Sequence, residues 1–293
     1  MTGMSDAEIS RLETEYFQKK YHADYCTGNF TPTLCALTGV RTPRQAGCPP
    51  AAQVLDLAKE KLKSGNVEKM LIFCPDAIGE VHRDHCPEIF RPLDTCGDLR
   101  LRGTTVMRSV TPICFATIFS GASPIVHGIR DFVKPVLTVE TLFDVLAEAG
   151  KNVAIVSRDE CSIDQIFRGR PVDYYGLRSD EAIERTTVRL VKEDHYDVIV
   201  SYMEDFDSYG HHTDVFSPEC IRELNSAVRR FSDYAKLIDT YWSRYDRLLT
   251  FTPDHGQHRV CDAKGYHGTH RDDVPEDMVV NHYFRIRSGE NPR

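Results

Sequence analysis

Short apolar runs in this sequence lead into polar clusters of aspartate and histidine. The clusters are Asp76 after the run 70–74, Asp207 and His211 after the run 197–201, and Asp254 and His255 after the run 248–252. Polar residues that follow strands collect at the carboxyl edge of an α/β sheet, so clusters that are distant in sequence can meet there. The pattern therefore predicts a metal site at one edge of a sheet.

The order of the predicted elements is that of an α/β protein. Apolar runs with the length of strands occur at 70–74, 152–156, 197–201 and 247–252. A helical pattern at 139–149 precedes the second run, and another begins after the third run at Ser217-Pro218, which suit the N-cap and the first helical position. Strand–helix–strand repetition predicts a doubly wound, mostly parallel sheet with helices on both faces.

The length and composition allow one large core. With 293 residues and 41% hydrophobic content, we expect a single α/β domain over residues 1–293. We expect residues 1–69 to form an N-terminal extension packed on that core, with a polar helix at 5–19, a Pro/Gly-rich loop and a helix at 51–63. Few residues are available for an inserted subdomain, so we expect a small or absent cap over the site.

Charge and hydropathy narrow the classes of partner. The net charge of -8 disfavours a surface for nucleic acid, and no apolar run approaches the roughly 18 residues that span a bilayer. The first twelve residues are polar and acidic, unlike a signal peptide, so we expect a cytoplasmic protein without a membrane partner. The ten cysteines are scattered without CxxC spacing, which favours reduced, buried thiols.

The segment from Ser109 to Gly121 makes the functional interpretation specific. It reads Ser-Val-Thr-Pro-Ile-Cys-Phe-Ala-Thr-Ile-Phe-Ser-Gly and is followed by Pro124-x-x-His-Gly128. It resembles the nucleophile region of the alkaline phosphatase superfamily, which includes nucleotide pyrophosphatases/phosphodiesterases, sulfatases and cofactor-independent phosphomutases. In that family a nucleophile opens a helix and a Ser/Thr-Gly pair follows about two turns later, which places Thr111 at the nucleophile position.

The aspartate and histidine clusters resemble the other motifs of the same superfamily, in its chain order and over about residues 70 to 280. The resemblance implies two metal ions, one held by Asp207, His211 and His267, and the other by Asp76, Asp254, His255 and the Thr111 oxygen. Carboxylate and imidazole ligands suit Zn²⁺ best, with Mn²⁺ as the alternative. Without the resemblance, the aspartates could instead cap helices and the histidines could lie on the surface.

The resemblance also implies an activity. It is closest in type to the nucleotide pyrophosphatase/phosphodiesterase branch, which predicts a hydrolase of small-molecule phosphoric esters that forms a phospho-threonine intermediate on a metal-bound Thr111. A helix that begins near Thr111 would offer backbone N–H groups to a phosphoryl oxygen. The alternatives are a cofactor-independent phosphomutase, a phosphonate hydrolase, or a binding protein that has lost the chemistry. A sulfatase is disfavoured, because that branch needs a Cys or Ser at the nucleophile position.

Two departures from the family pattern leave alternatives open. Many relatives place a proline two residues after the nucleophile, whereas Pro112 follows Thr111 directly, so Ser109 is a second candidate nucleophile. His270 competes with His267 as the last metal ligand, although the His-Gly match favours His267.

The sequence identifies the substrate-binding charges less well than the ligands. Arg83, Arg108 and Arg130 flank the motif loops and are candidates for binding a phosphoryl oxygen, although each is more typical of a solvated surface charge. The exact substrate and the oligomeric state are not specified by any motif.

Overall fold

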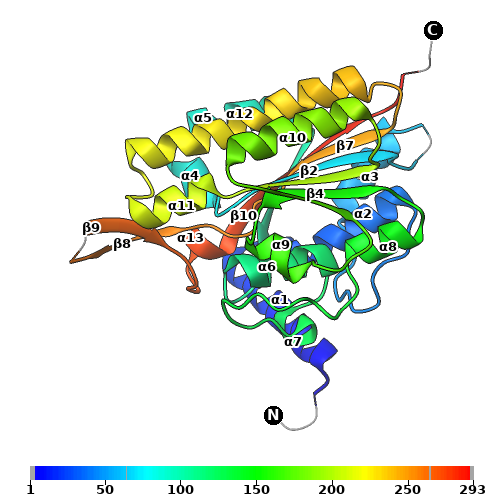
Figure 1. Cartoon of the computed structure of the whole chain (residues 1–293). Helices are drawn as coiled ribbons and strands as arrows, with labels where there is room; N and C mark the ends of the chain where they lie inside the picture. Colours follow the sequence, from blue (N-terminus) through cyan, green and yellow to red (C-terminus); the bar gives the residue numbers. More distant parts are fainter. Residues whose placement is uncertain (1–3, 64, 264, 291–293) are drawn as a thin grey trace.

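A single large sheet forms the centre of the computed structural model (Figure 1). The part of the chain that the structure describes, residues 4–63, 65–263 and 265–290, places eight strands in this sheet in the order β1-β3-β10-β7-β2-β6-β4-β5. The strands are β1 (Tyr25–Cys26), β2 (Lys69–Pro75), β3 (Leu99–Thr104), β4 (Val153–Arg158), β5 (Asp173–Leu177), β6 (Val198–Met203), β7 (Arg247–Phe251) and β10 (Val279–Arg287). A separate hairpin, β8 (His258–Asp262) and β9 (Gly265–Thr269), projects from the body.

The sheet is mostly parallel, as the sequence predicts. Of the eight strands described in this sheet, only β10 is antiparallel to its neighbours, β3 and β7. The central strands β2, β6 and β7 are buried at every position, and Ile72 of β2 lies between Val200 and Thr250. Strands covered on both faces read as continuous apolar runs, which is why these strands were recognisable in the sequence.

Helices cover both faces of the sheet (Figure 1). On one face lie α5 (Pro87–Cys96), α10 (Asp180–Glu193), α11 (Asp205–His212) and α12 (Pro218–Tyr241). On the other lie α2 (Phe30–Thr38), α3 (Ala52–Lys61), α6 (Thr111–Ser120), α8 (Leu142–Glu148) and α9 (Ser162–Ile166). The remaining helices are α1 (Asp6–Tyr21), α4 (Glu80–His85), α7 (Pro124–His127) and α13 (Pro275–Met278). The prediction of a doubly wound α/β fold is confirmed.

The start of α12 follows its sequence signature. The Ser217 side chain accepts a hydrogen bond from the Cys220 amide at 3.1 Å, and Pro218 occupies the first helical position. A capped start of this kind satisfies an amide that lacks a partner within the helix. The predicted helix start is therefore confirmed.

The N-terminal extension contains more regular structure than the sequence predicts. Both expected helices are present as α1 and α3, but the Pro/Gly-rich segment between them contains β1 and α2. Pro32 lies in the first turn of α2, where a missing N–H is tolerated, and Phe30 and Leu34 are fully buried. The loop assignment was wrong there, because the Pro/Gly content hid a short buried helix.

Strand ends, and not an inserted subdomain, surround the candidate site. Asp76 follows β2, Asp254 follows β7, and α11 begins directly after β6 at Asp205. These neighbouring strands are parallel, so their carboxyl ends lie on one edge of the sheet. Within the described residues, no helix is both long and apolar enough to cross a membrane.

Candidate metal centre and nucleophile

Among the described residues, two groups of three side chains have the spacing of metal ligands. We call Asp76, Asp254 and His255 the inner group, and Asp207, His211 and His270 the outer group. In each group the potential ligand atoms all lie within 4.8 Å of one another. The inner group is buried, and the cavity beside the centre is lined by the whole outer group and by Asp76 of the inner group.

The inner group combines two carboxylates with one imidazole. The His255 Nε2 atom lies 3.3 Å from Asp254 Oδ2 and 3.5 Å from Asp76 Oδ1. The His255 Nδ1 atom donates to the Gly256 carbonyl at 3.1 Å. Since a neutral imidazole carries one proton, this bond leaves the Nε2 lone pair directed at the carboxylates.

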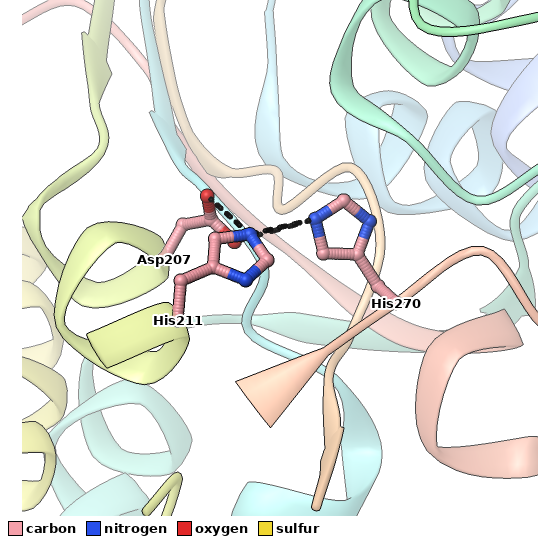
Figure 2. Close-up of side chains that lie close together, drawn as sticks. All are labelled: Asp207, His211 and His270. Atoms are coloured by element: carbon pink, nitrogen blue, oxygen red, sulfur yellow. Dashed lines mark hydrogen bonds and ion pairs between the residues drawn. The ribbon is translucent and has the colours of Figure 1, made fainter. Parts of the chain in front are cut away.

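The outer group has two histidines with this orientation, and Figure 2 shows their imidazole rings facing each other beside Asp207. His211 Nδ1 donates to the Gly268 carbonyl at 3.1 Å, and His270 Nδ1 donates to the Ser109 carbonyl at 2.7 Å. The Asp207 carboxylate lies 3.4 Å from His211 Nε2 and 3.6 Å from His270 Nε2. A second partner that fixes the tautomer in this way is typical of metal-binding histidines.

The two groups are adjacent. The imidazoles of His255 and His270 are stacked, with ring centroids 4.1 Å apart. One ring belongs to each group, so the inner and outer groups form one continuous centre at the sheet edge.

The charge state of the centre fits divalent cations. Asp76 Oδ1 and Asp254 Oδ2 are buried and have no hydrogen-bond partner among the described residues. Burial, followed by the nearby Asp254 carboxylate, raises the pKa of Asp76 well above its usual range, and burial raises the pKa of Asp254 to about 7. Burial lowers the pKa of His255 to about 4 and that of His270 to about 3. Clustered carboxylates beside neutral imidazoles are costly unless a cation compensates them.

Thr111 lies beside the inner group. It is the first residue of α6, and its Oγ1 atom is 3.4 Å from both Asp76 Oδ2 and His255 Nε2. The Ser109 hydroxyl instead accepts a hydrogen bond from the Arg271 amide at 3.2 Å. The structure therefore places Thr111, and not the alternative Ser109, against the potential ligands.

The start of α6 offers fewer amide donors than the sequence suggests. Pro112 has no N–H, and the amides of Ile113 and Cys114 both donate to the Val110 carbonyl at 3.0 Å. The expectation of several free donors is wrong for this helix, because its first turn already satisfies them. An anion at this end would be met chiefly by the Thr111 amide itself.

Asp207 and His211 are brought together by a helix. Both residues lie on α11, four residues apart. Side chains at this spacing share one helix face, so the carboxylate and the imidazole converge on one point. Gly210 is thus free to have another role.

The structure replaces His267 with His270 in the outer group. His267 lies on β9, where its Nδ1 contacts the Gly265 carbonyl at 3.4 Å and the Asp262 carboxylate at 3.8 Å. His270 is the third member of the outer group, and its Nε2 atom lies 3.1 Å from His211 Nε2. The two alternatives are three residues apart, and only the path of the chain after β9 distinguishes them.

Two polar residues that the sequence analysis missed hold the aspartates. The Tyr202 hydroxyl donates to Asp76 Oδ2, and Tyr202 is fully buried at the end of β6. The Gln257 amide donates to Asp207 Oδ1 at 2.5 Å. Tyr202 follows an apolar run and Gln257 follows the Asp-His-Gly motif, so their positions next to ligand motifs were the available signal.

A cavity of about 480 Å³ opens onto both Thr111 and the outer group. Lys134 and Arg271 contribute positive charge to its wall, and Phe132 contributes an aromatic ring. The three arginines proposed from the sequence do not line this cavity: Arg83 pairs with Asp94, Arg108 pairs with Asp131, and Arg130 is exposed. The cavity accommodates a small anionic ligand next to the threonine hydroxyl.

No known family model matches this sequence, and no curated protein matches it. The structure is similar to phosphonoacetate hydrolase from Sinorhizobium meliloti 1021 in complex with phosphonoformate, with a TM-score of 0.50 and 18% identity, covering 67% of this chain and 58% of that chain. It is also similar to murine ectonucleotide pyrophosphatase/phosphodiesterase 5, with a TM-score of 0.53 and 15% identity, covering 67% of this chain and 59% of that chain.

The match thus spans less than two thirds of the length of either protein. What the three chains share is the arrangement of helices around a mostly parallel sheet. Both of these proteins are members of the alkaline phosphatase superfamily, and this chain has the fold of that superfamily, as the motifs in its sequence predict.

Proposed function

We propose that the protein is a metal-dependent hydrolase of phosphoric esters, of the phosphodiesterase or nucleotide pyrophosphatase type, with Thr111 as its nucleophile. The observation that carries the proposal is the position of Thr111 Oγ1, 3.4 Å from one carboxylate and one imidazole of the inner group. A buried hydroxyl with these neighbours, opening onto a cavity, has the surroundings of an activated nucleophile.

The inner and outer groups would each hold one divalent cation, Zn²⁺ in preference to Mn²⁺. Three carboxylates and three imidazoles provide mixed oxygen and nitrogen ligands, and neither group includes a thiolate. When bound, the two cations would stabilise negative charge on the phosphoryl oxygens and favour ionisation of the threonine hydroxyl. In this assignment His270 takes the place that the sequence analysis gave to His267.

The chain's own residues define the expected chemistry. The Thr111 hydroxyl, which donates toward Asp76 Oδ2, would form a bond to phosphorus while the bond to the leaving oxygen breaks. The product is a phospho-threonine, which water then hydrolyses. Tyr202, by donating to the same Asp76 oxygen, keeps this carboxylate oriented while the threonine loses its proton.

A second candidate is hydrolysis of a phosphonate with a further anionic group. Lys134 and Arg271 line the same cavity as Thr111, and together they could bind a second negative charge. The fold similarity to a phosphonoacetate hydrolase supports the comparison, since that structure contains a small phosphonate. A phosphomutase is less well supported, because no inserted subdomain covers the described strand ends to keep water out.

The deciding experiment compares three substrates on metal-stripped protein supplied with Zn²⁺ or Mn²⁺: bis-p-nitrophenyl phosphate, p-nitrophenyl phosphate and phosphonoacetate. Metal-dependent cleavage of the diester that disappears in Thr111→Ala supports the proposal. Preferential release of phosphate from phosphonoacetate selects the second candidate. Absence of turnover on all three, with metals bound, would refute the assignment as a hydrolase of these classes.

The intermediate can be sought directly. Acid quenching during turnover, followed by peptide mass spectrometry, should show one added phosphoryl group on the peptide that contains Thr111. A phosphoryl group on Ser109 instead would move the nucleophile to the alternative residue.

A further inference from the structure

We propose that Gln257 is a positioning residue that holds the Asp207 carboxylate and connects the inner group to the outer group. The inference rests on the proposed function, because it concerns how this chain prepares its own residues for a metal ion. It also assigns a role to Gly210 on α11 and Gly268 on β9, which lie close to the outer group but have no side chain that could bind a metal.

Gln257 is fully buried and contacts Asp207 twice. Its Nε2 atom donates to Asp207 Oδ1 at 2.5 Å and to the Asp207 carbonyl at 3.2 Å. Both partners accept hydrogen bonds, so the nitrogen and not the oxygen of the amide must face them. A neutral donor fixes the carboxylate without cancelling its charge, and Oδ2 stays directed at His211 at 3.4 Å.

Two glycines leave the space that the Gln257 side chain occupies. A Cβ atom at Gly210 would lie 2.0 Å from Gln257 Oε1, and a Cβ atom at Gly268 would lie 2.4 Å from the same oxygen. Neither glycine has a positive φ, so the backbone conformation does not require glycine at these positions. Close approach of the Gln257 amide is therefore the reason for Gly210. At Gly268 it acts together with Val215, whose Cγ1 atom would lie 2.5 Å from the added Cβ atom.

The two glycines come from different elements of the outer group. Gly210 lies on α11 between Asp207 and His211, and Gly268 lies on β9. The Gly268 carbonyl also accepts the hydrogen bond from His211 Nδ1 at 3.1 Å. The Gln257 side chain therefore lies between α11, which carries Asp207 and His211, and Gly268, whose carbonyl orients His211.

Gln257 is also tied to the inner group through the chain. It follows His255 by two residues, and the intervening Gly256 donates its amide to the Asp277 carbonyl at 2.9 Å. The Asp277 carboxylate in turn accepts the amides of Arg271 and Asp272, next to His270, at 3.0 and 2.9 Å. The inner and outer groups are therefore held by one connected set of hydrogen bonds.

The test uses Gly210→Ala, because the three atoms nearest to the added methyl group, outside the backbone of its own helix, all belong to Gln257. Alanine suits the helix better than glycine, so the helix itself is not weakened. Calorimetric titration of the metal-stripped wild type with Zn²⁺ should show two sites. In Gly210→Ala one site should weaken by about 10- to 100-fold, the usual cost of losing a partner of a ligand.

Gln257→Ala provides the matched background. It removes the amide that donates to Asp207 and also the atoms that the methyl group of Gly210→Ala would meet. We therefore expect Gln257→Ala to weaken the same metal site. In the double variant, Gly210→Ala should cause no further loss of affinity. Gln257→Met keeps the side-chain volume and should reproduce the loss of affinity if the donor matters. Thermal unfolding of the metal-free variants checks that each is folded.

Activity gives a second readout. If Gln257 only positions a ligand, raising the Zn²⁺ concentration should restore the kcat of Gly210→Ala toward the wild-type value, whereas a general structural defect would not be rescued by metal. Two sites of wild-type affinity in both Gly210→Ala and Gln257→Met would overturn the role of Gln257. No Zn²⁺ binding by the wild type would instead overturn the proposed function.

Discussion

The Nε2 atoms of His211 and His270 face each other at 3.1 Å, while the Nδ1 atom of each ring donates to a main-chain carbonyl. While both rings are neutral, two lone pairs at this distance repel one another, and the hydrogen bond with Asp207 raises the pKa of His211, which favours a positive charge at this place. A cation between the rings would turn this repulsion into attraction.

Metal binding should therefore stabilise the folded protein. At a free Zn²⁺ concentration about one hundred times the dissociation constant, one site contributes about 2.7 kcal/mol to the free energy of unfolding. We expect the melting temperature to rise when Zn²⁺ is added to chelator-treated protein, and the rise to be smaller in His270→Ala. Identical melting curves with and without Zn²⁺ would contradict a role for these groups in metal binding.

Substitution of Thr111 should abolish catalysis without unfolding the protein. Thr111→Ala removes one hydroxyl and one methyl group, and we expect kcat/KM to fall by about three orders of magnitude or more, as for other lost nucleophiles. Thr111→Ser keeps a hydroxyl and should retain measurable activity. Ser109→Ala tests the alternative nucleophile, and a loss of activity there equal to that in Thr111→Ala would argue against the assignment.

His267 and His270 should respond differently to substitution. We expect His270→Ala to lower metal affinity by more than about 100-fold, the upper range for losing a partner that only supports a ligand. His267→Ala should stay close to the wild type, because that side chain contacts Gly265 and Asp262 on the hairpin. The metal content of both variants after dialysis distinguishes the two residues. A larger loss of metal in His267→Ala than in His270→Ala would identify His267 as the ligand.

Lys134 should contribute to the binding of substrates with a second anionic group. Its side chain lines the cavity, and a hydrogen bond to a charged group contributes about 1.5 kcal/mol or more, so Lys134→Met should raise KM for phosphonoacetate about tenfold or more. The KM for bis-p-nitrophenyl phosphate should change less. Arg130→Met, an exposed charge on the same segment, is the matched control. Equal changes with both substrates would remove Lys134 from substrate discrimination.

Acid should destabilise the fold through histidines away from the metal centre. Burial lowers the pKa of His82, His127 and His282 to about 4 in each case. Between about pH 4 and the unfolded pKa near 6.5, the unfolded chain binds more protons than the folded chain. The free energy of unfolding should then decrease as pH falls through this window, by up to about 1.4 kcal/mol per pH unit for each histidine.

Urea unfolding of metal-free protein at pH 7, 6 and 5 measures this slope. His127→Asn should reduce the slope by about one proton, because the remaining buried histidines still titrate. A slope that is unchanged in this variant would show that His127 is protonated in the folded state.

The sequence predicts those strands and helices whose pattern of apolar and polar residues matches their burial in the folded protein. The runs that became β2, β6 and β7 are apolar throughout because both faces are covered, and Ser217-Pro218 carries its own helix signal. β10 was missed because polar residues such as Asn281 and His282 interrupt its apolar pattern. These residues are buried, and His282 bonds to Tyr25 and to the Pro253 carbonyl.

The same distinction applies to the site. Residues that lie directly after strands could be identified from their spacing, because the sheet dictates where they meet. The choice of His270 over His267 depends on the path of the chain after β9. Tyr202 contacts Asp76, which is 126 positions away in the sequence, and Gln257 contacts Asp207, which is 50 positions away. Spacing along the chain carries no information about such contacts.

The place of β10 has a consequence for how the protein is made. β10 lies between β3 and β7, yet it follows every other strand in chain order. During synthesis the part of the sheet that carries Asp76 and Asp254 can pair around β2, β6 and β7 before β10 leaves the ribosome, but β1 and β3 can join it only afterwards. The nascent chain would therefore hold an open sheet edge until β10 emerges, and a chaperone that shields exposed strands would act at that edge.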